Sequence, residues 1–166
     1  MDGILGRIVA IVLGLLALAG IAYAGYNGFQ SHKASVVATN ISQLITNARA
    51  GFSQGNNGYT NFTTANVASM ITSGMFPSDM VRGTTLIDSW GNAVTLASAN
   101  SGSQGVITFG GGNAQTAKQC VSTALGLKDY VTLAVGSTTF NQTNLPDQAT
   151  AGAACSATAT FTLTFQ

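Results

Sequence analysis

The feature that most constrains this chain is a run of nineteen residues without a charged side chain, from Ile8 to Tyr26. At about 1.5 Å per residue, a helix of this length nearly crosses the hydrocarbon core of a bilayer. The sequence therefore predicts a membrane-inserted N-terminal helix. A cleavable signal peptide is the alternative, because Ala22-Tyr23-Ala24 has the small-residue spacing of a cleavage site, although Arg7 is the only base before the run.

The sequence after the apolar run becomes amphipathic without a break. Apolar residues recur with the spacing of one helical face between Ala34 and Phe52, and no proline precedes Pro77. We expect one helix of close to 75 Å that ends near Ala50, at Gly51. A cleaved leader would have no reason to share a helix with the mature domain, which disfavours the signal peptide.

The expected organisation has two parts. An N-terminal helix over residues 1–52 consists of a hydrophobic half (1–28) and an amphipathic half (29–52), and a globular domain follows over residues 53–166. Gly14, Gly20 and Gly25 lie inside the hydrophobic half, where each costs about 1 kcal/mol relative to alanine. These glycines would let the helix bend, unwind or pack closely in a protein assembly, or they are simply small residues that suit a membrane helix.

The globular part alternates short helical and strand patterns. Together they predict an α+β fold in which the long helix packs against an antiparallel sheet. The expected elements are a short helix over Ala65–Ser73, capped by Thr63 or Thr64; a helix over Gln115–Leu125; strands over Ala93–Ala97, Val106–Phe109, Tyr130–Val135 and Ala157–Phe165; and a loop over Gly136–Ala154.

Charge is scarce along the whole chain. Only 7% of residues are charged, there is no glutamate, and the net charge is +1. Such a balance gives no electrostatic footprint for nucleic acid, and a surface with little charge favours contact between identical neighbours.

Two cysteines, Cys120 and Cys155, are present and neither belongs to a Cys-x-x-Cys motif. Export to an oxidising compartment, which the N-terminal segment implies, favours a disulfide between them. Two buried free thiols are the alternative.

No constellation of catalytic or metal-binding residues is visible. The five aspartates are dispersed and His32 is the only histidine, so neither acid–base catalysis nor a metal site is expected. The Gly110-Gly111-Gly112 run lacks the lysine of a phosphate-binding loop and is interpreted as a turn. We therefore expect no enzyme activity and no cofactor.

Three segments carry a resemblance to type IV pilins, specifically to the type IVb subgroup. Ser35 to Leu44, with the later Gly58-Tyr59, resembles the helix and following loop of toxin-coregulated and conjugative thin-pilus subunits. Ala114 to Cys120 resembles the helix that carries the first cysteine in that family, and the cysteine pair brackets its variable region. The resemblance covers essentially the whole chain and implies the type IV pilin fold.

The family pattern is broken near the N-terminus. Pilins usually carry a glutamate at the fifth mature position, thought to pair with a neighbour's N-terminal amine, and this chain has Leu5 there. An unpaired charge in an apolar filament core is costly. The hypothesis is that Asp2 takes over the role by pairing with the Met1 amine or with Arg7 of a neighbour; the alternative is that Asp2 only caps the helix start.

The resemblance also implies partners and processing. It implies a leader removed by a prepilin peptidase, methylation of Met1, pilus assembly machinery, and an inner-membrane stage before the subunit enters an extracellular pilus on the bacterial surface. The sequence is then the mature form or a chain with an atypical start. The expected partner in the pilus is the chain itself, as a helical homopolymer for adhesion, aggregation or conjugation. A minor pilin or pseudopilin, a membrane-anchored binding protein and, least favoured, a membrane-anchored enzyme are the rivals.

Overall fold

The computed structural model describes the backbone of residues 2–166 and the side chains of residues 11–18, 25 and 28–166. The chain divides into two compact units, Met1–His32 and Lys33–Gln166, which are described separately. Helix α1 (Asp2–Phe52) is continuous through both. The amphipathic half of this helix therefore belongs largely to the same compact unit as the strands.

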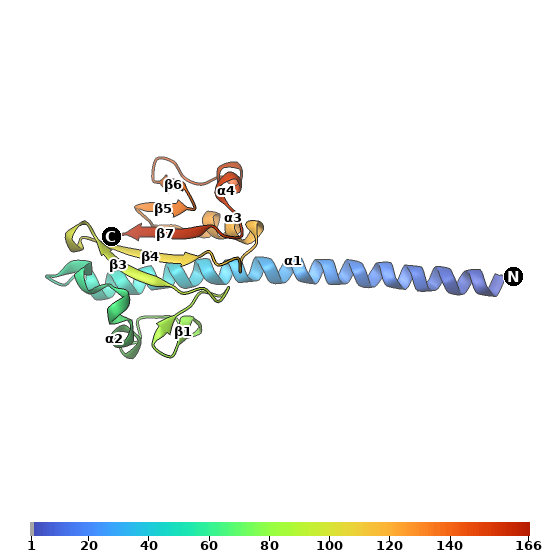
Figure 1. Cartoon of the computed structure of the whole chain (residues 1–166), viewed down its shortest axis with the longest axis horizontal. Coiled ribbons are helices and arrows are strands. Elements are labelled where there is room, and N and C mark those ends of the chain that lie inside the picture. Colours follow the sequence, from blue (N-terminus) through green and yellow to red (C-terminus); the bar gives the residue numbers. More distant parts are fainter. Residues whose placement is uncertain (1) are drawn as a thin grey trace. The chain divides into compact units, whose positions relative to one another are not determined.

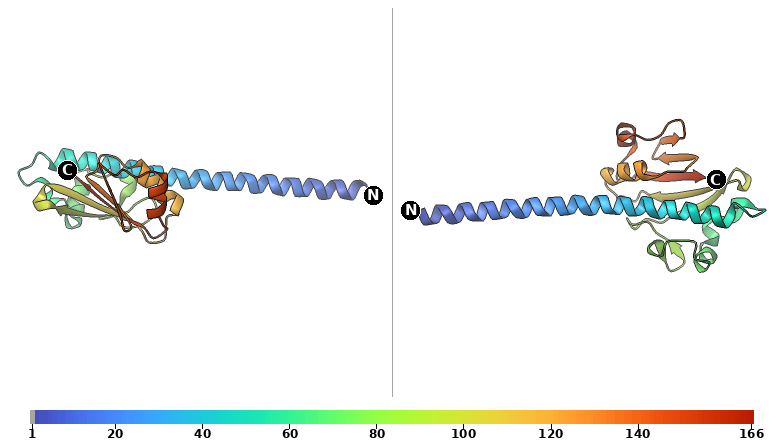
Figure 2. Two further views of the ribbon diagram at one scale, coloured as in Figure 1. Left: turned by 90° about the horizontal axis from the view of Figure 1, so that it is seen from above. Right: turned by 180° about the vertical axis from the view of Figure 1, so that it is seen from behind.

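The second unit is built on one antiparallel five-stranded sheet. Its strands run in the order β3 (Thr95–Ala99), β4 (Gln104–Gly110), β7 (Thr160–Phe165), β5 (Thr132–Val135) and β6 (Thr138–Asn141). The C-terminal strand β7 lies in the middle, and β3 and β6 form the two edges. Figure 2 shows the strands on one side of the C-terminal part of α1.

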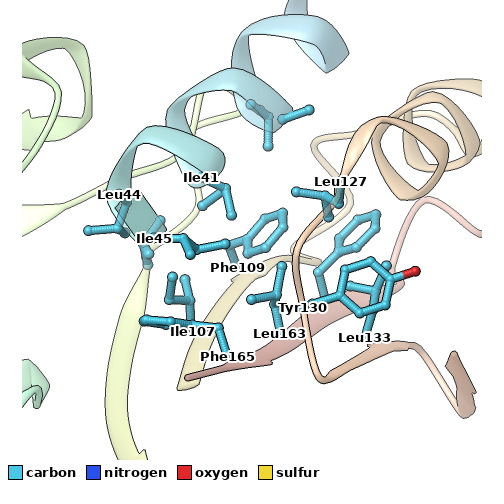
Figure 3. Packing of buried hydrophobic residues seen from close by; sticks show 14 of the residues in the cluster. Ile41, Leu44, Ile45, Ile107, Phe109, Leu127, Tyr130, Leu133, Leu163 and Phe165 are labelled. Atoms are coloured by element: carbon cyan, nitrogen blue, oxygen red, sulfur yellow. The ribbon is translucent and has the colours of Figure 1, made fainter. Parts of the chain in front are cut away.

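The hydrophobic core lies between this part of α1 and the sheet. Ile41 and Ile45 of α1 are buried and face Ile107 and Phe109 of β4, with Leu163 of β7 beside them (Figure 3). Strand residues alternate in burial along β4 and β7, as expected for a sheet with one covered face. The structure confirms the predicted α+β fold, a long helix packed against an antiparallel sheet.

A segment of short elements connects α1 to the sheet. It contains 3₁₀ helices, helix α2 (Val67–Thr72) and a small hairpin of β1 (Val81–Arg82) and β2 (Thr85–Leu86) (Figure 1). The predicted cap at Thr63 or Thr64 is wrong, because neither side chain caps the helix there. The Thr64 hydroxyl instead donates to the carbonyl of Leu96 at 3.0 Å and accepts from its N–H at 2.8 Å, which occupies the open edge of β3.

The segment after β5 also differs from the prediction. The expected loop over Gly136–Ala154 contains strand β6 and helix α4 (Gln148–Ala154). Gly136 has a φ of 57° and allows the tight turn that pairs β6 with β5, and Phe140 is then buried. Asp147 begins α4 through a capping box with Thr150. Helix α3 (Ala117–Gly126) lies beside α4, near its predicted bounds (Figure 1).

Candidate functional site

The most distinctive surface of the first unit is an apolar stretch of α1. The side chains of residues 11–18 are all exposed, and the large ones expose 49% to 65% of their area. Because consecutive helical residues are about 100° apart, eight in a row cover every side of the helix. A soluble monomer rarely leaves so large a contiguous apolar surface in water, so this stretch is a candidate interaction surface. We call residues 11–18 the assembly surface. Its large side chains are Ile11, Val12, Leu13, Leu15, Leu16 and Leu18.

Two of the three glycines singled out from the sequence lie in the described part of this unit. No atom of the described residues lies within 4 Å of the position that a Cβ would take at Gly14 or Gly25. Contacts within the described part of the chain therefore do not require a glycine at either position. The absence of a side chain lets another helix approach the backbone closely at these points.

The other predicted assembly residues cannot be placed. Met1, the side chains of Asp2, Leu5 and Arg7, and the surroundings of Gly20 lie outside the described part of the structure, so the roles predicted for these residues stay predictions. Some side chains of the predicted membrane span lie outside the described part as well. Among the residues that the structure describes, no helix is both long enough and apolar enough to cross a membrane.

Polar side chains of α1 fix the second half of the helix to the rest of its unit. The Arg49 guanidinium donates to the carbonyl oxygens of Gln166 and Asp129, each at 2.7 Å. The buried Asn40 donates through Nδ2 to the Asp79 carboxylate at 2.7 Å, and Asn47 donates to the carbonyl of Met75 at the same distance. These bonds attach the helix to two separate segments of the second unit, Lys33–Gln166, which is called the head from here on.

The predicted disulfide is present. Cys120 in α3 is fully buried and is bonded to Cys155, the residue that follows α4, across a sequence separation of 35. The buried amide of Gln115 supports the same region, donating to the carbonyl of Ala159 at 2.7 Å. The bond therefore ties the end of the α4 segment to the helix beside the sheet.

The aspartates of the head are not gathered into a site. Asp88 is buried and its carboxylate accepts hydrogen bonds from the N–H groups of Trp90, Asn92 and Gly110, which is a structural role. The N–H and hydroxyl of Thr150 hold the pKa of the exposed Asp147 carboxyl below its usual range. In the part of the chain that the structure describes, no three His, Cys, Asp or Glu side chains gather as they would around a metal ion.

Two features of the head were not predicted from the sequence. Leu145, in the loop between β6 and α4, exposes 59% of its area. A cavity of about 180 Å³ lies at the opposite edge of the sheet, with Val67, Leu86 and Val94 in its lining. The exposure of Leu145 could have been predicted, because it is a large apolar residue inside an otherwise polar loop. Nothing in the sequence indicates the cavity.

Comparisons with known proteins agree with this geometry. The family described as PilS, "PilS N terminal", matches residues 31–166. The fold is similar to that of the crystal structure of a type IV b pilin from Salmonella typhi, with a TM-score of 0.56 and 19% sequence identity over 84% of this chain and 97% of that chain. No curated protein sequence matches.

Proposed function

The chain belongs to the PilS family of type IV pilus subunits and has the fold of a type IVb pilin, and we propose that it polymerises through the hydrophobic half of α1. In this proposal the helices of many copies pack side by side as the core of a filament. The heads then form its outer surface. The subunit is a structural component of the pilus.

The observation that carries the proposal is the uncovered assembly surface over residues 11–18. Transferring each of its large aliphatic side chains from water into an apolar contact is worth about 1.5–3 kcal/mol. A bundle of identical helices buries this surface on all sides. Within a single chain, no part that the structure describes covers it. Gly14 and Gly25 offer positions of close approach within such a bundle.

The same surface suits a stage before assembly. We propose that the uncharged run from Ile8 to Tyr26 is held in the inner membrane until the subunit joins the filament, and this part of the proposal rests on the sequence. Exchange of lipid for neighbouring helices keeps the run away from water throughout. Release by a prepilin peptidase, methylation of Met1 and delivery by pilus assembly machinery belong to the same proposal.

The N-terminal charges are proposed to set the contact between copies. Leu5 stands where a pilin glutamate is expected, so we assign its role to Asp2, which would pair with the Met1 amine or with Arg7 of a neighbour. A charge in an apolar core requires such a partner. An Asp2→Asn variant is expected to assemble poorly, and Asp2→Glu, which keeps the charge, is the matched control. Normal assembly of Asp2→Asn would refute the pairing.

Adhesion, aggregation and conjugative mating are the proposed uses of the filament, carried by the heads. Electron microscopy of material sheared from cells tests the main proposal. Abundant fibres that contain this chain support a major subunit, whereas traces at fibre ends indicate a minor pilin or pseudopilin. A chain that is absent from any fibre and stays dispersed in detergent would be a membrane-anchored binding protein, and polymerisation would be refuted.

A further inference from the structure

The head presents one apolar side chain on a well-defined loop. Among residues 33–166, Leu145 is the large hydrophobic residue with a highly exposed side chain. On one side of it, Asn141 and Asn144 exchange two backbone hydrogen bonds of 3.1 Å. On the other side, Pro146 restricts the backbone and Asp147 caps α4. A side chain held on such a loop loses little freedom when it docks.

The cavity at the other edge of the sheet is a suitable receptor for that side chain. It lies between α2, the β1–β2 hairpin and β3, and its lining includes the buried side chains of Val67, Leu86 and Val94. Threonines, among them Thr84 and Thr85, complete the lining together with Ala93, and no charged residue contributes. Its volume is about 180 Å³, and apolar cavities of roughly 150 Å³ are known to hold a six-carbon ring. A leucine side chain has only four carbons.

The two features lie at different places on the head, so their contact joins two different surfaces. The cavity adjoins β3 and Leu145 follows β6, and these strands form the opposite edges of the five-stranded sheet (Figure 1). We propose that Leu145 of one subunit inserts into this cavity of the next subunit in the filament. Such a head-to-tail contact uses two different surfaces, and when its rotation does not close into a ring it repeats along a helical fibre. This inference rests on the proposed polymerisation and adds a contact between the heads.

Charges beside the two surfaces are complementary. Asp147, two residues after Leu145, is exposed. Arg82 is exposed in β1, directly opposite Thr85 of the cavity lining in the β1–β2 register. When Leu145 enters the cavity of a neighbour, the Asp147 carboxylate approaches a surface that carries a cation. Opposite charges beside an apolar contact favour the correct partner and register.

Cysteine cross-linking in assembled filaments tests the contact. The described part of the chain has no free cysteine, so a cross-link in these variants comes from the introduced cysteines. Filaments of the full-length double variant Leu145→Cys, Thr85→Cys are oxidised mildly and run on a non-reducing gel. We expect a ladder of covalent multimers, absent from either single variant. The matched control pairs Leu145→Cys with Ser103→Cys, which is also exposed but lies beyond the far end of β3, and it should give no ladder.

A second measurement covers the case in which the double variant does not assemble. Leu145→Ala should raise the subunit concentration needed for filament formation by about tenfold or more, while Leu145→Met should leave it nearly unchanged. Filaments of normal yield from Leu145→Ala, or filaments of the double variant without a ladder, would overturn this contact and leave polymerisation intact. Failure of the unmodified chain to form any filament would overturn both proposals.

Discussion

The Nε atom of Arg49 lies 2.7 Å from the carbonyl oxygen of Gln166, which is 117 residues later in the chain. This hydrogen bond joins the last turn of α1 to the end of β7, the central strand of the sheet. The guanidinium also lies 5.9 Å from the centre of the Phe165 ring. The helix that we propose as the filament core is therefore bonded directly to the middle of the head.

Replacing Arg49 should weaken this attachment. Arg49→Ala removes two charge-assisted hydrogen bonds to carbonyl oxygens and is expected to lower the free energy of unfolding by about 1–3 kcal/mol. Urea unfolding of the full chain in mild detergent, followed by the fluorescence of the single tryptophan, Trp90, measures the change. Arg82→Ala is the control and should change it by less than about 0.5 kcal/mol, because Arg82 is exposed. Equal effects of the two substitutions would contradict the assigned role of Arg49.

The disulfide should make a large contribution to the stability of the head. It closes a loop of 35 residues, and in the chain-entropy model this stabilises the fold by about 3–4 kcal/mol. The double variant Cys120→Ala, Cys155→Ala should therefore unfold at a clearly lower urea concentration than the parent. Reduction of the parent should reproduce the shift, and a reduced parent that unfolds where the oxidised one does would contradict the prediction.

Substitution of Asp88 should lower the stability of the head, although its sequence context does not indicate a structural role. Its carboxylate, 4% exposed, accepts N–H groups from two turns that are far apart in sequence. Asp88→Ala leaves these buried donors without a partner and should cost about 2–5 kcal/mol, with Asp88→Asn intermediate because one oxygen remains. Thermal unfolding monitored at Trp90 gives the values. Asp129→Asn, at an exposed residue, serves as control; a loss as large as that of Asp88→Ala would speak against a specific role for the buried carboxylate.

Acid should loosen α4 through Asp147. Hydrogen bonds from Thr150 lower the pKa of this carboxyl in the folded state, so its stabilising effect is complete above the unfolded pKa. The effect is then lost as the pH falls through the lower folded pKa. Hydrogen exchange of residues 148–154, corrected for the intrinsic pH dependence, should show protection that declines only in acid. Asp147→Asn does not titrate and should remove the decline; the same acid response in that variant would assign it to another group.

The sequence was sufficient where a long periodic pattern determined the structure. The helical spacing from Ala34 to Phe52 predicted the buried face of α1, and the alternation ending at Phe165 predicted β7. The loop expected over Gly136–Ala154 was wrong, because β6 is only four residues long and is defined by its pairing with β5. Threonine is a common helix-capping residue, but the hydroxyl of Thr64 instead donates a hydrogen bond to the carbonyl of Leu96, 32 residues away.

The candidate site was predictable only in part. The uncharged run from Ile8 to Tyr26 is evident in the sequence, and it contains the assembly surface over residues 11–18. The cavity bounded by α2, β2 and β3 arises from elements that are brought together only by the tertiary fold. Asp88 is another such case, since its partner Gly110 lies 22 residues away and nothing local marks the pair.

A high-resolution reconstruction by cryo-electron microscopy of filaments sheared from cells would show whether the N-terminal helices form the filament core. Leu13, Leu16 and Leu18 expose 61%, 64% and 65% of their area in the single chain. We expect all three to be buried against α1 helices of neighbouring copies in the filament core. Filaments built from this chain in which these side chains remain exposed, or in which the heads alone make the contacts, would contradict polymerisation through the N-terminal helix.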